Sequence, residues 1–305
     1  MNRIVIFIAM ISMVMVAQGQ DAEPAETQLP GHEILLFDIE QNAHGVLALS
    51  VGKNITGRIG YDNQPKFSDL GGLLYYTRAV SSGDGIQMDI YQYDVATGQT
   101  QAYMITTRSE YSATPMRNSP HLSVVQVDEV GDQYVVILNQ SAAADQQFRR
   151  TSDLKQVGYF NWTADGGLWS FVLNDSDGGD LYLQKKGAQA AKLTANIGRA
   201  LVTDSAGMDL YYVDKNTQPW RIHKRNSAGL FEDVMPLPMG VEDFTLDSAG
   251  RFWAGRGNTL YVSTDQKRWF IIAEFDQPEL HQITRLTTNP QADKIAVVFA
   301  EKITE

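Results

Sequence analysis

The sequence contains no cysteine among its 305 residues. That absence excludes a disulfide framework, a thiol nucleophile, cysteine-ligated zinc and a cysteine-linked lipid anchor. Basic residues are also scarce, since 25 Lys and Arg stand against 36 Asp and Glu and the formal net charge is −11. This balance argues against nucleic acid and against an anionic membrane surface as partners, because both attract clustered cations.

Familiar catalytic motifs are missing as well. The sequence has no G-x-S-x-G elbow, no phosphate-binding loop and no G-x-G-x-x-G fingerprint. Its five histidines show no metal-ligand spacing. Beyond the N-terminal segment no stretch keeps a 3.6-residue apolar period, so we expect very little helix.

The N-terminus has the pattern of an export signal. Arg3 precedes an apolar run over residues 4–17, and Ala17 and Gly19 are small residues suited to a cleavage site. The run is short for a membrane span, which needs about 20 residues. We therefore predict a cleaved signal peptide over residues 1–19 and a periplasmic or secreted protein without a stable membrane anchor; the alternative is an anchoring helix. Residues 20–31 are acidic and predict a flexible tail.

The rest of the sequence repeats one pattern about every 40–50 residues. Each copy is a Gly/Asp/Ser/Asn-rich turn that leads into a short apolar strand. A second kind of strand, with an aromatic residue at one place, follows each copy after a polar turn. The six turn segments are residues 66–72, 116–119, 162–167, 202–207, 246–250 and 288–290.

Short strands at even spacing with a period of this length predict an all-β, six-bladed β-propeller over residues 32–305, with four antiparallel strands per blade. The first strands, residues 33–39 and 46–51, have no preceding partner, and the last, near residues 284–288 and 294–299, have no following one. We expect these strands to complete one blade together, because pairing hides their edges. Residues 34–37 should then lie antiparallel to residues 295–299.

One stretch carries a family resemblance. Residues 108–116, Arg-Ser-Glu-Tyr-Ser-Ala-Thr-Pro-Met, and the turn at residues 162–166 resemble the WD40-like repeats of TolB-type periplasmic propellers. Residues 117–120 depart from the usual Pro-Asp-Gly continuation. The resemblance covers about residues 32–300 and implies a fold and a location. Residues 20–31 are too short for the additional N-terminal domain of TolB, so we expect that domain to be absent. The resemblance does not imply a particular activity, because propellers include both binding modules and enzymes.

One acidic cluster, residues 174–180, could in principle bind Ca²⁺ through its oxygens. Gly and Asp are also the residues that hairpin turns require, and the distal Glu of an EF-hand is missing. We predict a hairpin turn here.

A ring of polar residues is the remaining candidate site. The innermost strands of a propeller begin at the mouth of its central channel, so the residues just before the turn units should surround that mouth. These are Asp62, Asn63, Glu110, Gln156, Asn196, Glu242, Asp243 and His281. Such an acidic ring suits a cation, a basic peptide or a polar small molecule; the alternative is a solvated rim without a ligand.

These observations favour a monomeric, non-catalytic binding or scaffold propeller that recognises an envelope protein or an extracellular ligand and holds no cofactor. The alternative is a Ca²⁺-dependent hydrolase or lactonase with its site in the channel. That alternative needs several carboxylate or amide ligands that converge on one metal ion.

Overall fold

The computed structural model describes residues 29–82, 85–139, 147–176, 178–276 and 280–302. Within these ranges every regular element is a β-strand, and all strand pairs are antiparallel. The predicted all-β class and the expected lack of helix are therefore confirmed for this part of the chain. The predicted signal peptide and nearly all of the predicted tail lie outside the described residues.

Three four-stranded sheets follow the chain in simple order. The first contains β4 (Asp62–Phe67), β5 (Leu73–Ser82), β6 (Gly85–Asp94) and β7 (Thr100–Met104). The second contains β8 (Glu110–Pro115), β9 (Leu122–Val127), β10 (Gln133–Leu138) and β11 (Phe148–Arg150). The third contains β19 (Phe244–Leu246), β20 (Phe252–Arg256), β21 (Thr259–Ser263) and β22 (Phe270–Glu274).

A seven-stranded sheet lies between the second and the third of these in sequence. It contains β12 (Val157–Trp162), β13 (Leu168–Leu173), β14 (Gly179–Gln184), β15 (Ala190–Thr203), β16 (Leu210–Asp214), β17 (Arg221–Arg225) and β18 (Phe231–Pro236). The long strand β15 pairs with two neighbouring strands. Its first half pairs with β14 as far as Ile197, and from Ile197 onward it pairs with β16. The two groups of strands thus share one continuous strand where the sequence pattern predicted two separate units.

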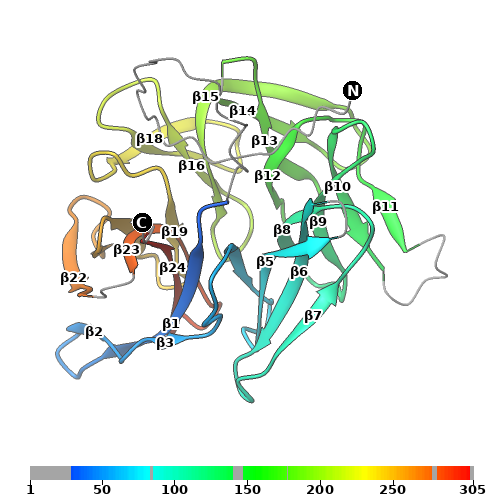
Figure 1. The fold of residues 1–305 in the computed structure, drawn as a ribbon. Helices are drawn as coiled ribbons and strands as arrows, with labels where there is room; N and C mark the ends of the chain where they lie inside the picture. The colour runs from blue at the N-terminus through cyan, green and yellow to red at the C-terminus, as the bar shows by residue number, and fades with distance from the viewer. Residues whose placement is uncertain (1–28, 83–84, 140–146, 177, 277–279, 303–305) are drawn as a thin grey trace, which may run out of the picture.

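The last sheet joins the two ends of the described chain. Its order is β2 (Leu47–Leu49), β1 (His32–Gln41), β24 (Lys294–Glu301) and β23 (Leu280–Thr288), and β3 (Lys53–Asn54) also pairs with β1. Ile34 lies opposite Val298 and Phe37 opposite Ile295 in antiparallel register. The predicted pairing of the N-terminal and C-terminal strands is confirmed, and Figure 1 shows β1 directly beside β24.

The sheets stand around a common centre (Figure 1). Their innermost strands contact one another in the order β4, β8, β12, β15, β19 and β23, and β23 contacts β4 again. This closed circuit of strands surrounds the axis of the molecule. The apolar core lies between neighbouring sheets as a series of separate clusters.

Strand β24 shows how these clusters are built. Successive side chains of a strand point to opposite faces. Ile295, Val297 and Phe299 therefore pack with Trp253 and Leu260 of the β19–β22 sheet. On the other face Ala296 and Val298 pack with Leu74 and Tyr76 of β5. The closing strand is buried against both neighbouring sheets.

The predicted turns are confirmed. Residues 165–166 lie in the bend between β12 and β13, and residues 206–207 lie in the bend between β15 and β16. Gly166 and Gly207 have φ of +82° and +72°, in the left-handed region that glycine adopts without strain. The described residues of the acidic cluster, 174–176 and 178–180, connect β13 and β14 as the predicted hairpin does, while residue 177 lies outside the described residues. The Asn174 amide donates to the Gly178 carbonyl, and the Asp180 carboxylate accepts from Lys192.

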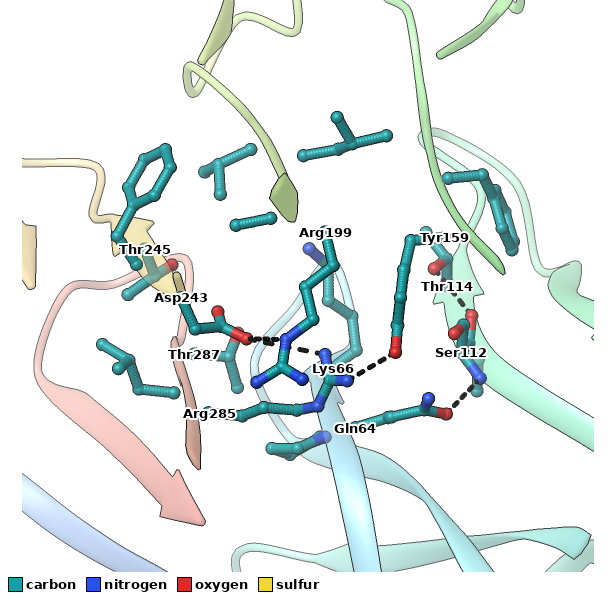
Figure 2. Close-up of a pocket in the computed structure, with 18 residues that line it drawn as sticks. Gln64, Lys66, Ser112, Thr114, Tyr159, Arg199, Asp243, Thr245, Arg285 and Thr287 are labelled. Carbon is teal, nitrogen blue, oxygen red and sulfur yellow. Dashed lines mark hydrogen bonds and ion pairs between the residues drawn. The ribbon is translucent and has the colours of Figure 1, made fainter. Parts of the chain in front are cut away.

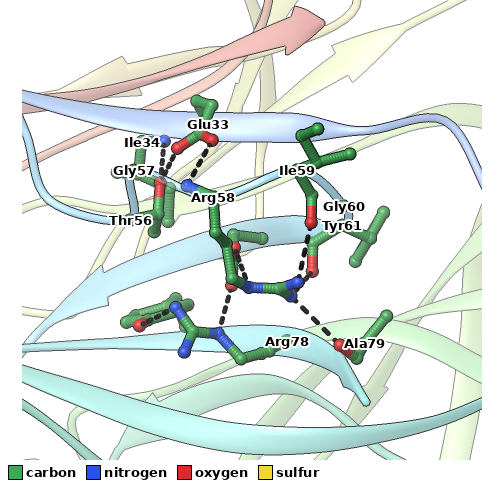
Figure 3. Close-up of polar contacts among 12 residues, drawn as sticks. Glu33, Ile34, Thr56, Gly57, Arg58, Ile59, Gly60, Tyr61, Arg78 and Ala79 are labelled. Atoms are coloured by element: carbon green, nitrogen blue, oxygen red, sulfur yellow. Dashed lines mark hydrogen bonds and ion pairs between the residues drawn. The ribbon is translucent and has the colours of Figure 1, made fainter. Parts of the chain in front are cut away.

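A buried ion cluster ties the N-terminal strand to the inner strand β4 (Figure 3). The Asp62 side chain is fully buried between Arg58 and Arg78, with Oδ2 at 2.9 Å from Arg58 Nε and Oδ1 at 2.7 Å from Arg78 Nε. The Arg58 backbone amide donates to the Glu33 carboxylate on β1 at 2.8 Å, and its guanidinium donates to the Ala79 carbonyl at 3.0 Å. The segment before β4 is thereby fixed to β1 and to β5.

Candidate functional site

Irregular pairing in the inner strands shapes the centre of the ring. The register shifts between Asn63 and Lys66 in β4, and between Tyr111 and Thr114 in β8. Similar shifts occur in β12, β15 and β23. Gln64 and Ser112, inside the first two shifts, have φ of 58° and 53°. Such bulges turn side chains away from the alternation of a regular strand.

The redirected side chains surround a cavity of about 100 Å³ on the axis (Figure 2). Neighbouring inner strands are joined here by hydrogen bonds. The Ser112 amide donates to Gln64 Oε1 at 2.8 Å, and the Ser112 hydroxyl donates to the Gly158 carbonyl at 3.2 Å. The polar lining residues labelled in Figure 2 are Gln64, Lys66, Ser112, Thr114, Tyr159, Arg199, Asp243, Thr245, Arg285 and Thr287.

Two arginines share one carboxylate at this cavity. Asp243 Oδ2 lies 3.3 Å from Arg199 Nε and 3.5 Å from Arg285 Nη1. Arg199 also donates to the Thr284 carbonyl at 2.8 Å, and Arg285 donates to the Tyr159 hydroxyl at 2.6 Å. Burial opposes the charge of Arg285, but Tyr159 and Asp243 raise its pKa overall, so the guanidinium stays protonated.

Lys66 adds a third basic side chain. Burial lowers the pKa of its ammonium group, with the nearby Arg117 acting in the same direction. In the described part of the chain, the Lys66 side chain makes no hydrogen bond or ion pair. The cavity lining therefore carries Lys66, Arg199 and Arg285 against the single carboxylate of Asp243. A protein of net charge −11 thus has a centre of positive charge.

A wider cavity of about 350 Å³ continues the channel toward the turn segments. Its walls include Ser68, Asn118, Ser205 and Ser248 from four of the predicted turn units. Five residues line both cavities and form the neck between them: Lys66, Thr114, Val202, Thr245 and Thr287. The two cavities are therefore direct neighbours along the channel.

Of the eight residues predicted to ring the channel mouth, Asp243 lines the inner cavity. The other seven line neither of these two cavities. Asp62, Asn63 and Glu110 are buried, Gln156 and Glu242 are half-buried, and Asn196 and His281 are exposed. Six of the seven bind neighbours within the protein: Asp62 pairs with arginines, Asn63 accepts from the Gln64 amide, Glu110 accepts from Thr106 and Gln126, Gln156 donates to Asp132, Asn196 donates to Asn216, and Glu242 pairs with Lys215.

Glu110 is the most unusual of these residues. Its Oε1 atom accepts from the Thr106 hydroxyl at 2.6 Å and from Gln126 Nε2 at 2.9 Å. Its Oε2 atom is buried without a hydrogen-bond partner. Burial raises the pKa of the Glu110 carboxyl to about 7, although the two hydrogen bonds act in the opposite direction.

This raised pKa predicts a pH-dependent stability. Between its ordinary pKa of 4.5 and about 7, Glu110 keeps its proton in the folded state and loses it in the unfolded state. The free energy of unfolding should therefore fall as the pH rises through this range, by about 3 kcal/mol at most. In Glu110→Gln this loss should disappear, as measured by urea unfolding at pH 5 and pH 8. The exposed Glu274→Gln is the control and should follow the wild type; an equal loss in Glu110→Gln would contradict the assignment.

The sequence prediction of the site did not include Arg199, Arg285 or Lys66. It considered the residues just before each turn unit, and it assumed inner strands with regular alternation of their side chains. One signal was present: Arg199 interrupts the otherwise apolar run at residues 197–202, and Arg285 lies between the apolar residues Ile283 and Leu286. A lone cation in an inner strand that must be buried indicates a side chain with a partner at the axis.

The lining residues do not suit a divalent cation. Such an ion needs several oxygen ligands of negative or neutral charge. Asp243 is already paired with two guanidinium groups, and Lys66 adds further positive charge. Among the described residues, no group of three or more His, Asp or Glu side chains could hold a metal ion.

The fold resembles solved structures more clearly than the sequence resembles known families. A protein described as TolB from Agrobacterium tumefaciens matches with a TM-score of 0.67 and 13% identity, over 90% of this chain and 99% of that one. A gluconolactonase from Xanthomonas campestris matches with a TM-score of 0.58 and 11% identity, over 91% of this chain and 98% of that one. TolB from Acinetobacter baumannii matches with a TM-score of 0.55 and 11% identity, over 89% of this chain and 65% of that one.

The fold is a β-propeller. The predicted likeness to TolB-type propellers is supported at the level of architecture, since identities of 11–13% show the fold alone. No protein-family model and no curated protein matches the sequence. The propeller neighbours include both TolB and a gluconolactonase, so the fold by itself is compatible with binding and with catalysis. In the described residues, no helix has the length and apolar character needed to cross a membrane.

Proposed function

We propose that this chain is a non-catalytic binding propeller that recognises its ligand or partner at the wide end of the central channel. The observation that carries the proposal is the 350 Å³ cavity, which lies next to the cationic inner cavity and shares five lining residues with it. Turn residues from several sheets form the walls of the wide cavity. Concave sites of this size with a few convergent polar groups are typical of ligand binding.

The proposal includes a ring of six blades. If β15 is divided at Ile197, where its pairing changes from β14 to β16, each blade has four main strands. The inner strands of these blades are then the six that follow one another around the axis. The blade completed by β1 and β24 closes the ring.

A Ca²⁺-dependent hydrolase or lactonase is the competing function. It would place a divalent cation on the axis, where Arg199, Arg285 and Lys66 repel it and Asp243 is already paired. The charge of the lining therefore supports binding of an anionic or polar group over metal-assisted hydrolysis. Of the eight residues predicted to ring the channel mouth, Asp243 is the one that has a role in this proposal. It pairs with the two arginines and holds them in position.

The proposed location is the periplasm or the outside of the cell, with residues 1–19 as a cleaved signal and residues 20–31 as a tail. The motivation is the N-terminal sequence pattern. An envelope protein or an extracellular ligand is the proposed partner of the mature, monomeric chain.

Site-specific photo-crosslinking in the native host tests the proposal. A photoreactive residue replaces Ser205, which is exposed at the wide cavity, and in a matched variant it replaces the exposed Ala96 in the outer turn between β6 and β7. We expect one discrete crosslinked product from position 205 and none from position 96. The purified protein should not hydrolyse lactones with or without Ca²⁺. Ca²⁺-stimulated hydrolysis, or equal crosslinking from both positions, would overturn the proposal.

A further inference from the structure

Three side chains with hydrogen-bond donors that have no partner in the described chain line the neck of the channel. Thr245 of β19, Thr287 of β23 and Lys66 of β4 line both cavities. Their strands are neighbours around the axis, because β23 contacts both β19 and β4. Within the described chain, the two hydroxyl groups and the Lys66 ammonium have no hydrogen-bond partner. Thr114, which also lines the neck, is different, because its hydroxyl donates to the Ser112 carbonyl at 3.0 Å.

The charges near these three donors favour a negatively charged ligand. Arg199 and Arg285 lie at the inner cavity next to the neck, and Asp243 offsets only one of their two positive charges. In the described chain Lys66 forms no close ion pair, although Asp243 and Asp69 act on its charge from a longer distance. Lys66 is half-buried, and a partly desolvated ammonium group without a close partner is stabilised when an anion supplies one.

We propose that the neck of the channel binds the carboxylate group of a small organic acid, with Lys66, Thr245 and Thr287 as its hydrogen-bond donors. A carboxylate offers two oxygens with about four acceptor positions, which matches one ammonium and two hydroxyl groups. The rest of the acid would occupy the 350 Å³ cavity, whose walls carry Arg117 and also the carboxylates of Asp69, Asp204 and Asp247. This inference rests on the proposed function and names the ligand class for the same channel.

Isothermal titration calorimetry on the mature protein tests the site. The probes are acetate, succinate, citrate and inorganic phosphate, each at constant ionic strength with chloride as the reference anion. We expect succinate and citrate to bind more tightly than chloride. Lys66→Met should weaken this binding at least about tenfold, because the charged hydrogen bond and the ion pair are both lost. The matched variant Lys186→Met removes an exposed lysine in the turn between β14 and β15 and should bind like the wild type.

The double variant Thr245→Val and Thr287→Val tests the hydroxyl groups without changing charge or side-chain shape. It should weaken succinate binding about tenfold or more. Thermal unfolding without ligand confirms folding: Lys66→Met should melt no lower than the wild type, because it removes a partly desolvated ammonium group without a close partner.

Three results would overturn the carboxylate site: no heat of binding for succinate and citrate, equal affinity in Lys66→Met and the wild type, or phosphate binding more tightly than every carboxylate. Crosslinking from position 205 does not depend on these titrations. If it still yields one product while the acids do not bind, the carboxylate site is wrong and the proposed function stands.

Discussion

Deletion of residues 292–305 is expected to abolish the cooperative unfolding transition of the whole propeller, including sheets far away in sequence. The deletion removes β24, whose residues Ile295 to Val298 are 0% exposed and whose Phe299 is 1% exposed. Each large apolar side chain that loses its burial costs about 1.5–3 kcal/mol. The sum is comparable with the entire stability of a domain, about 5–15 kcal/mol.

The effect spreads because β24 lies between β1 and β23 and also packs against two neighbouring sheets. Without it, β1 loses its main partner and both adjacent core clusters open to water. Circular dichroism during heating provides the measurement. A truncated protein that melts cooperatively within a few degrees of the intact one would show that the ring does not depend on this closure.

Two point variants test whether stability depends on the closing strand β24 or falls equally when any aromatic side chain is removed. Phe299→Ala removes a ring buried between β24 and the β19–β22 sheet and should lower the free energy of unfolding by about 3–5 kcal/mol. Phe270→Ala changes a residue that is 44% exposed and should cost less than about 1 kcal/mol. Similar losses for both variants would contradict the proposed importance of the closing strand.

The second large effect is expected for Asp62→Asn. Asp62 is the carboxylate between Arg58 and Arg78, and its side chain is fully buried. The neutral amide leaves two guanidinium groups close together without a counter-charge. Loss of one partner of a buried ion pair costs about 3–5 kcal/mol. Urea unfolding at neutral pH should show this loss in the free energy of unfolding.

Asp233→Asn is the control for this variant. Asp233 also pairs with an arginine, Arg221, at 2.7 Å, but its side chain is 50% exposed. Water and salt replace such a contact readily, so the cost should be about 1 kcal/mol or less. If Asp62→Asn is as mild as Asp233→Asn, the cluster at β4 does not stabilise the junction with β1.

The sequence by itself determined the class of the fold and the way the ring closes. These features depend on local signals. Glycine at positions such as Gly166 and Gly207 permits the left-handed turn, and short alternating strands require a partner on each side. The antiparallel pairing of residues 34–37 with residues 295–299 followed from the same reasoning, because an apolar strand without a neighbour in sequence must find one elsewhere.

Only the tertiary structure decided which residues form the centre of the channel. The sequence predicted an acidic mouth from Glu110, Glu242 and the other residues before each turn unit, whereas the inner cavity on the axis carries Lys66, Arg199 and Arg285 beside Asp243. The physical reason is the register shift in the inner strands. A bulge of one or two residues reverses which side chains face the axis, and it depends on pairing with the neighbouring strand rather than on any local preference of the sequence.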